Sequence, residues 1–331
     1  MGEKGHKYTA RTLSSTSLKK DRERSTNHEN GEKAEILREK FFPSKVKADT
    51  SDLINSCSPK HQIVIESKVT PEEVESILKQ LPRGKAPGPD EIPNEILQAI
   101  LPEWKVELAN SITQLLCTGQ IPASYKESIT VALRKDRRPD YSIPSSYRPI
   151  ALENSLARLV EKIVSNRITT AADKYGMLPW AQMGARQKRS TISALELLIS
   201  SVQVVWDATL GCVVSMLSLD IKVAFDNIST EPLTWVLKRE GFPQWVIGYV
   251  ENFVVSRRTK IRSPGFTSDW IQTEVGIPQG SHLSPILFLF YISELIDDLQ
   301  RPEDGYMAFG FVDDTTIVAW GNKTKQNCVS L

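Results

Sequence analysis

The sequence predicts an α+β fold, and three observations support this class. Apolar residues recur at helical spacing in several segments, most clearly in 155–171 and from 283 to 299. Short β-prone runs at 127–136, 212–221 and 306–321 lie between the helical segments in no regular order. The chain shows no internal repeat. Helices and strands are therefore expected to alternate irregularly over 331 residues, enough for one large domain or two small ones.

The N-terminal segment, residues 1–60, is polar and mixed in charge, and we predict that it is largely disordered. One short helix is expected within it, over 31–44, where Pro43 stops the helical pattern.

The first well-marked helix is predicted over 70–81. Thr70 can cap it, Pro71 stands at the first helical position, and Glu73 completes a capping box. Its apolar side chains at 74, 77, 78 and 81 share one face.

The same spacing rules locate the remaining elements. A stretch rich in Pro and Gly at 82–93 predicts a rigid loop. Further helices are expected at 94–119, 155–171, 190–206, 230–240, 246–256 and from 283 onward. Strands are expected at 127–136, 212–221, within 258–275 and, as a hairpin with two acids at its turn, at 306–321.

Charge indicates a partner only locally. Over the whole chain, 41 Lys and Arg nearly balance 40 Asp and Glu. Between Arg134 and Arg189, however, twelve basic residues stand against five acidic ones. This surplus suits an anionic partner, and a solvated surface explains such a cluster equally well.

The cysteines and apolar runs narrow the cellular setting. The four cysteines lie far apart and form no C-x-x-C pair, which indicates reduced thiols and neither a disulfide frame nor a zinc site. The N-terminus lacks a secretory pattern, and the longest apolar run, PILFLFYISELI, is about half a membrane span. We therefore expect a soluble intracellular protein with no membrane contact.

Three aspartates are the first candidates for chemistry. Asp220 ends a β-prone run, and Asp313 and Asp314 stand at the predicted hairpin turn, 93 residues after Asp220 (313 − 220). Each site alone is more typical of a solvated turn. Together they can converge on adjacent strands, where three carboxylates need a cation to stay ionised. Two Mg²⁺ ions, with Mn²⁺ as the alternative, are the expected cofactors because they prefer oxygen ligands and leave positions for phosphate.

A second candidate is the loop GIPQGSHLSP at 276–285. Gly276 and Gly280 permit close backbone approach, and Gln279 and Ser281 offer polar groups before a long helix. The pattern is compatible with a ligand-facing loop and with a helix-capping loop, and we favour the first.

These stretches together resemble a known family. LDIKVAFD, GIPQGSHLSPILF and FVDD, in this order and spacing, resemble the palm motifs of reverse transcriptases. Upstream, KAPGPDEIPNEIL, YRPIALENSLARLVEKIVSNRI and QMGARQKRSTISAL extend the resemblance to those of non-LTR (LINE-like) retrotransposons of the fungal type. The similarity covers roughly residues 70–331.

The resemblance implies a right-hand polymerase fold with fingers over about 61–205 and a partial palm over about 206–331. It implies RNA-directed DNA polymerase activity, with an RNA template, a DNA primer and dNTPs as partners. By position, Asp220, Asp313 and Asp314 would be catalytic and bind the metals. Phe225, Gln279, Gly280, Arg148 and Lys135 would contact the incoming nucleotide, with Phe225 excluding a ribose 2′-OH. Gln182, Gly184 and Arg186 would lie along the template path, with packing inside the fingers as an equal alternative.

The sequence also departs from the family pattern. Val223 replaces a usual Gly, His282 replaces a usual Pro, and KDRR at 135–138 replaces a usual KPGK turn. Only 17 residues follow Asp314 (331 − 314), so the thumb is expected to be absent, and about 70 N-terminal residues leave no room for an endonuclease.

We therefore expect weak or no activity from this chain alone. A catalytically inactive remnant that binds nucleic acid is the competing hypothesis, and a group II intron or other organellar reverse transcriptase is the nearer alternative. The expected location is the nucleus for a LINE-like element and the mitochondrion for an organellar enzyme.

Overall fold

The computed structural model describes residues 27–43, 58–209, 211–221, 224–263 and 266–330. Its α-helices are α2 (Asn27–Phe41), α3 (Pro71–Gln80), α4 (Asn94–Thr118), α5 (Ser155–Tyr175), α6 (Thr191–Ala208), α7 (Thr230–Glu240), α8 (Gln244–Val254), α9 (Ser284–Asp298) and α10 (Thr324–Ser330). Its strands are β1 (Glu127–Arg134), β2 (Tyr147–Glu153), β3 (Val213–Asp220), β4 (Arg257–Ser263), β5 (Phe266–Thr267), β6 (Ile271–Thr273), β7 (Tyr306–Phe311) and β8 (Asp314–Gly321). Short 3₁₀ turns are η2 (Ala123–Lys126), η3 (Pro144–Ser146) and η4 (Pro302–Asp304).

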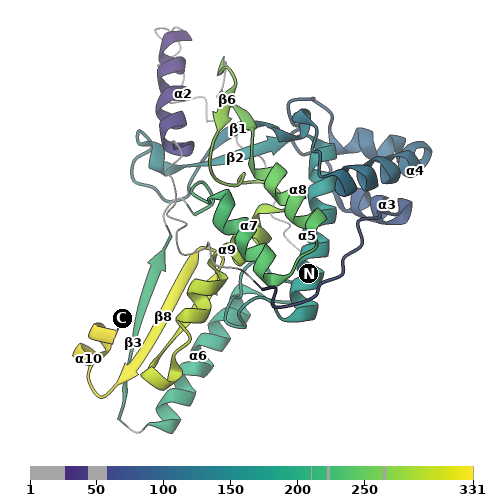
Figure 1. Cartoon of the computed structure of the whole chain (residues 1–331). Coiled ribbons are helices and arrows are strands. Elements are labelled where there is room, and N and C mark those ends of the chain that lie inside the picture. Colours follow the sequence, from purple (N-terminus) through teal and green to yellow (C-terminus); the bar gives the residue numbers. More distant parts are fainter. Residues whose placement is uncertain (1–26, 44–57, 210, 222–223, 264–265, 331) are drawn as a thin grey trace, which may run out of the picture.

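Two separate sheets organise these elements (Figure 1). The first has the order β2-β1-β4-β5, with β6 also paired to β4; β1 runs antiparallel to β2 and parallel to β4. The second is antiparallel with the order β3-β8-β7. Helices α5, α7, α8 and α9 lie between the two sheets in Figure 1. The expected α+β class is therefore confirmed.

Helix α9 forms the centre of the core between the sheets. It is apolar around most of its circumference, and Leu287, Phe288, Leu289 and Phe290 are all fully buried. A helix of that composition must be covered on every side, because exposed apolar surface is unfavourable in water. The Ser281 hydroxyl accepts hydrogen bonds from the backbone N–H groups of residues 283 and 284 (3.0 and 3.3 Å) and so caps the helix.

The capping box predicted for helix α3 is only half formed. The Thr70 hydroxyl accepts from the Glu73 N–H at 3.2 Å, as the sequence predicts. The Glu73 carboxylate, however, does not reach back to Thr70 but pairs with Arg167 of α5 at 2.7 Å. The tertiary contact replaces half of the capping box, since a charged partner stabilises the carboxylate more than a backbone N–H does.

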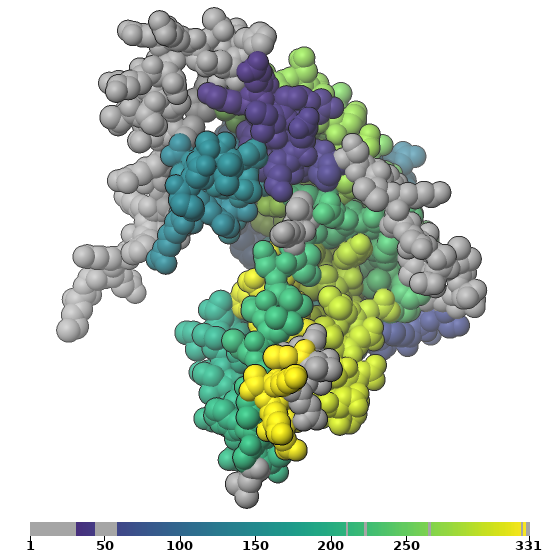
Figure 2. All heavy atoms as spheres, turned by 90° about the vertical axis from the view of Figure 1, so that its left-hand side faces the viewer, coloured from purple at the N-terminus to yellow at the C-terminus, as the bar shows by residue number. Residues whose placement is uncertain are grey.

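The short helix predicted in the N-terminal segment is present, with different bounds. Within the segment 1–60, expected to be largely disordered, residues 27–41 form α2, which begins earlier than the helix predicted over 31–44. Figure 2 shows α2 against the β1–β2 end of the molecule, where it contacts η3, β4 and β5. Phe41 is only 3% exposed, so its burial supplies the apolar contact that holds α2 there. Residues 1–26 and 44–57 lie outside the described residues.

The two sheets interleave along the chain. β4, β5 and β6, at residues 257–273, pair with the sheet of β1 and β2, whereas β3 before them and β7 and β8 after them form the other sheet. The division into fingers at about 61–205 and palm at about 206–331 stays a prediction.

Helix α6 is long and apolar enough to cross a membrane by length and composition alone, and 6% of that window is buried. Its residues Leu197, Leu198 and Val202 pack against the core, and the helix contacts β7. Helix α6 therefore packs beside the second sheet.

Candidate active site

Asp220, Asp313 and Asp314, which we call the acidic edge, meet at one end of the second sheet. Strands β3 and β8 pair so that Asp220 lies directly opposite Asp314. Asp313 belongs to the two-residue turn that joins β7 to β8, and Asp314 is the first residue of β8 rather than part of the turn. Asp220 and Asp314 are exposed and Asp313 is half-buried. The predicted convergence of these residues on adjacent strands is therefore present.

The electrostatics of the acidic edge favour a cation. Partial burial, together with the negative charges of Asp313 and Asp220, raises the pKa of Asp314. Within the described part of the chain, no three His, Cys, Asp or Glu side chains are close enough to hold one ion by themselves. Mg²⁺ does not require such a cage, because it is usually held by one or two carboxylates together with water and substrate phosphates. The donor set of the acidic edge is therefore of the type that Mg²⁺ prefers.

The turn between β7 and β8 is strained, and neighbouring residues support it. Val312 has φ +59°, a backbone conformation that is unusual for a β-branched residue. The segment after α5 packs against this turn: the Met183 N–H donates to the Gly310 carbonyl at 2.7 Å, and the Gln182 side chain donates to the Val312 carbonyl at 3.4 Å. A Cβ on Gly184 would lie 2.4 Å from the Val312 nitrogen, so only glycine fits there. These contacts hold Asp313 in position.

Gln182 and Gly184 are located in buried packing contacts, whereas Arg186 is half-buried and its place on a template path stays a prediction. Gln182 is completely buried, and Gly184 is buried as well. The Arg186 guanidinium donates to the Pro179 carbonyl at 3.0 Å and pairs with Asp173 at 3.2 Å. A side chain with no exposed surface cannot reach a template, so packing, which the sequence left as the alternative, is the arrangement observed for Gln182 and Gly184.

The loop before α9 is fixed from two sides. The Gln279 amide donates to both carboxylate oxygens of Asp226, at 3.1 and 3.2 Å, and the Ala151 N–H of β2 donates to the Gln279 carbonyl at 2.7 Å. Gly280 has φ +122°, and a Cβ there would lie 2.7 Å from the Ala151 carbonyl oxygen. The loop can therefore lie this close to β2 only with glycine at position 280.

Asp226, which follows the aromatic Phe225 in SLDIKVAFDN, was given no role by the sequence. Burial raises its pKa to about 6, and the hydrogen bond from Gln279 and the charges of Lys40 and Lys135 act in the opposite direction. In the sequence, only its position six residues after Asp220 indicated that it could belong to the site.

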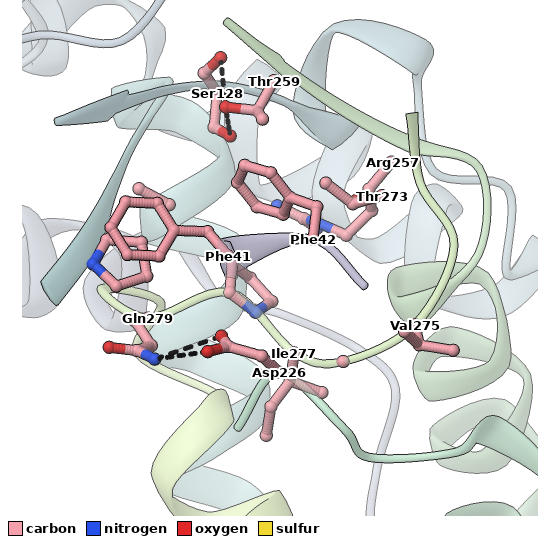
Figure 3. Close-up of a pocket in the computed structure, with 14 residues that line it drawn as sticks. Phe41, Phe42, Ser128, Asp226, Arg257, Thr259, Thr273, Val275, Ile277 and Gln279 are labelled. Carbon is pink, nitrogen blue, oxygen red and sulfur yellow. Dashed lines mark hydrogen bonds between the residues drawn. The ribbon is translucent and has the colours of Figure 1, made fainter. Parts of the chain in front are cut away.

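Phe41 of α2 and the next residue, Phe42, line a small cavity beside this loop. Figure 3 shows Phe41 and Phe42 between the Ser128–Thr259 pair and the Asp226–Gln279 pair. The remaining space is about 40 Å³, close to the volume of one water molecule and far too small for a nucleotide. The sequence predicted the helix but had no signal for where its two phenylalanines would pack.

Of the two predicted phosphate-binding cations, Arg148 lies in β2 of the first sheet and Lys135 directly follows β1. Arg148 of β2 is the neighbour of Leu133 in β1, and the Lys135 N–H donates to the Ser146 carbonyl at 2.8 Å. Burial, followed by the positive charges of Arg138, Arg148 and Lys40, lowers the pKa of Lys135, and the negative charge of Asp220 opposes this. Lys135 therefore lies within electrostatic reach of both the other cations and Asp220.

Phe225 is half-buried and stacks on Phe288 of α9, with ring centroids 5.0 Å apart. The Ile277 N–H donates to its carbonyl at 2.8 Å, so the ring and its backbone are both held by the core and the loop. Phe225 does not line the small cavity. Val223 lies outside the described residues.

Comparison with known proteins agrees with this geometry. A family model for reverse transcriptase (RNA-dependent DNA polymerase) matches residues 133–331. The chain is 30% identical over 224 residues to a probable RNA-directed DNA polymerase from transposon BS of Drosophila melanogaster, covering 68% of this chain and 24% of the relative. It is 28% identical over 256 residues to the RNA-directed DNA polymerase from mobile element jockey of the same species, covering 76% of this chain and 27% of the relative.

A third relative is the Pol polyprotein from type-1 retrotransposable element R2 of Popillia japonica, 28% identical over 257 residues, covering 75% of this chain and 34% of the relative. A solved apo telomerase from Candida tropicalis aligns with a TM-score of 0.45 and 12% identity over 72% of this chain and 51% of that one, too distant a likeness to support an argument. The chain belongs to the reverse transcriptase family, and its relatives are RNA-directed DNA polymerases of non-LTR retrotransposons. It spans about a quarter to a third of the length of the curated relatives named here.

Proposed function

We propose that this chain is the fingers and palm part of a LINE-like RNA-directed DNA polymerase, which joins a dNTP to the 3′-OH of a DNA primer on an RNA template. The acidic edge carries this proposal. Asp220 lies opposite Asp314, Asp313 adjoins them in the turn, and Lys135 interacts with Asp220 from the other sheet. Carboxylates facing cations are the arrangement that nucleotidyl transfer requires, because metal ions and basic side chains together neutralise a triphosphate.

The acidic edge would hold two Mg²⁺ ions, which when bound activate the primer hydroxyl and stabilise the leaving pyrophosphate. Lys135 and Arg148 would bind the triphosphate oxygens through charge-assisted hydrogen bonds. Gly280, which is exposed and has no Cβ, would let the nucleotide approach the loop, and Gln279 would line that approach. Phe225 would exclude a ribose 2′-OH through its bulk.

Primer extension tests this proposal. Mg²⁺-dependent dNTP incorporation on a primed RNA template is compared between wild type, Asp313→Asn and Asp304→Asn. Asp304 is an exposed aspartate of η4 outside the acidic edge and serves as the matched control. We expect weak incorporation by the wild type and by Asp304→Asn, and none by Asp313→Asn. Incorporation that is unchanged in Asp313→Asn would overturn the proposal.

Nucleic-acid binding without catalysis is the second candidate function, favoured by the basic surplus between Arg134 and Arg189. Because phosphate contacts release counterions, RNA affinity should fall steeply as salt rises and should survive Asp313→Asn. Binding that does not weaken with salt would contradict this. Salt-sensitive binding without any incorporation by the wild type would favour this second function. The expected nuclear location, or a mitochondrial one for an organellar enzyme, stays a prediction.

A further inference from the structure

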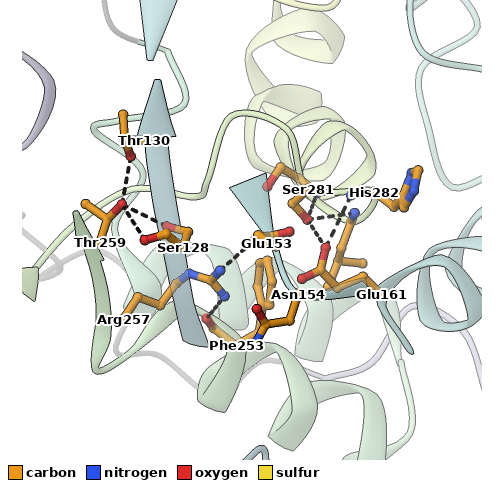
Figure 4. Close-up of polar contacts among 12 residues, drawn as sticks. Ser128, Thr130, Glu153, Asn154, Glu161, Phe253, Arg257, Thr259, Ser281 and His282 are labelled. Atoms are coloured by element: carbon orange, nitrogen blue, oxygen red, sulfur yellow. Dashed lines mark hydrogen bonds and ion pairs between the residues drawn. The ribbon is translucent and has the colours of Figure 1, made fainter. Parts of the chain in front are cut away.

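A second group of carboxyls lies in the interior, behind the nucleotide loop. Glu153 at the end of β2, Glu161 on α5 and Arg257 at the start of β4, which we call the buried acid cluster, are each at most 4% exposed (Figure 4). Arg257 forms an ion pair with Glu153 and donates to the Phe253 carbonyl at 3.2 Å. One guanidinium therefore stands against two carboxyls, which leaves one of them without a counter-ion.

The hydrogen bonds show how the second carboxyl is accommodated. Glu153 Oε1 accepts from Arg257, whereas Glu153 Oε2 has no N–H or hydroxyl donor within the described part of the chain. The Glu161 and Glu153 carboxyls lie close enough to affect each other's pKa, and a hydrogen bond between them requires a proton on one of the two. A proton on Glu161 satisfies that orphan oxygen, because a protonated carboxyl donates one hydrogen bond and still accepts others.

The electrostatics agree with a neutral Glu161. Burial, followed by the charge of Glu153, raises the pKa of Glu161 well above its usual range, and Arg257 only partly opposes this. The positive charge of Arg158 acts on Glu153, and the buried Tyr249 of α8 lies within electrostatic reach of both carboxyls. Burial and the neighbouring carboxyl therefore favour the protonated form of Glu161.

The other side of Glu161 faces the nucleotide loop. Its Oε2 accepts from the Ser281 hydroxyl at 2.5 Å and from the His282 N–H at 3.3 Å. Ser281 follows Gln279 and Gly280 directly and also caps α9. A continuous chain of contacts thus runs from Arg257 in the first sheet through both carboxyls to the loop.

We infer that Glu161 is a positioning residue that, as a neutral carboxyl, holds the 279–281 loop in the geometry needed to receive a nucleotide. The inference deepens the proposed function and rests on it for the nucleotide. The position of the loop itself does not depend on activity.

The test compares Glu161→Gln, which keeps an acceptor for Ser281 and a donor for Glu153, with Glu161→Leu, which has neither. Amide hydrogen exchange over 279–284 is the first measurement. We expect exchange within about twofold of wild type for Glu161→Gln and more than about tenfold faster for Glu161→Leu, because two hydrogen bonds are lost. The inference would be overturned by exchange in Glu161→Gln as fast as in Glu161→Leu. Exchange in Glu161→Leu as slow as in wild type would also overturn it.

A second pair of variants covers the case in which Glu161→Leu does not fold. Ser281→Ala removes the hydroxyl that contacts Glu161. Ser293→Ala is its matched control, because Ser293 is a buried serine of α9 whose hydroxyl donates to the Phe290 carbonyl. Exchange over 279–284 should rise roughly fivefold in Ser281→Ala and stay at the wild-type rate in Ser293→Ala. Equal rates in the two variants would contradict the inference.

Primer extension then separates positioning from general stability. We expect Glu161→Leu to raise the KM for dNTP with little change in kcat, and Glu161→Gln to restore the wild-type KM. If the wild type incorporates no dNTP, the proposed function fails for this chain, and hydrogen exchange still decides the role of Glu161.

Discussion

The molecule contains two groups of carboxyls that differ in how their charge is compensated. The buried acid cluster has an internal cation, Arg257, a carboxyl whose pKa is raised by burial, Glu161, and contacts with the loop. The acidic edge has two exposed carboxylates and one half-buried one, and Lys135, which interacts electrostatically with Asp220, directly follows β1 of the other sheet. The comparison teaches that a group complete in itself supports the fold, whereas a group left incomplete is available for ligands.

The largest expected effect comes from breaking the complete group. Arg257→Met removes the cation and leaves Glu153 buried without a partner, which should lower the free energy of unfolding by about 3–5 kcal/mol. The double variant with Glu153→Leu should recover much of that loss, because both buried charges are then removed. Denaturant unfolding measures both. A double variant as unstable as Arg257→Met alone would show that the ion pair does not explain the effect.

A change at the acidic edge should act on ligand affinity and leave the fold intact. Asp220→Asn removes one carboxylate opposite Asp314, so Mn²⁺ affinity in the presence of dNTP should fall by at least about tenfold. The free energy of unfolding should stay within about 0.5 kcal/mol of wild type, since the site is exposed. A large loss of stability with unchanged Mn²⁺ binding would erase the distinction between the two groups.

The support of the acidic edge can be disturbed without touching a carboxylate. Gly184→Ala places a Cβ 2.4 Å from the Val312 nitrogen, and this overpacking should cost about 1–3 kcal/mol of stability and displace the turn. Gly211→Ala is a useful control, because a Cβ there meets nothing within 4 Å although its φ of +78° adds some strain. Equal losses of dNTP incorporation in Gly184→Ala and Gly211→Ala would show that the packing of residues 182–184 against the β7–β8 turn does not explain the effect.

The smallest expected effect is a pH dependence of the free energy of unfolding that arises from Asp226, a carboxyl that belongs to neither group. Asp226 has a pKa of about 6, raised by burial from 3.8. The native state therefore binds more protons than the unfolded state between these values, and the stabilisation is full below about pH 4 and lost as pH rises through 6. Relative to Asp226→Asn, the wild type should lose roughly 1–2 kcal/mol across this window.

Unfolding curves of both proteins at several pH values measure this difference. The difference is the relevant quantity because His282, whose pKa burial and the charges of Lys162 and Arg158 lower to about 4, contributes a slope of opposite sign in wild type and variant alike. Parallel stability–pH curves for the two proteins would show that Asp226 is not buried as described.

Local sequence determined the elements and the residue types at the site. The spacing of apolar residues predicted α9, and the run around Asp313 predicted the β7–β8 hairpin, because both depend on periods of a few residues. The order of the motifs was also sufficient to predict the reverse transcriptase family, to which the chain belongs.

The tertiary structure alone decided which of these residues meet. The register that sets Asp220 opposite Asp314 spans 94 residues (314 − 220), and Glu161 reaches Ser281 across 120. The same holds for Gln182, for which template contact and packing were equal alternatives and which is buried, and for Phe41, which packs beside the loop from the helix expected over 31–44. Contacts at such separations depend on how helices and sheets pack, and no local period encodes that packing.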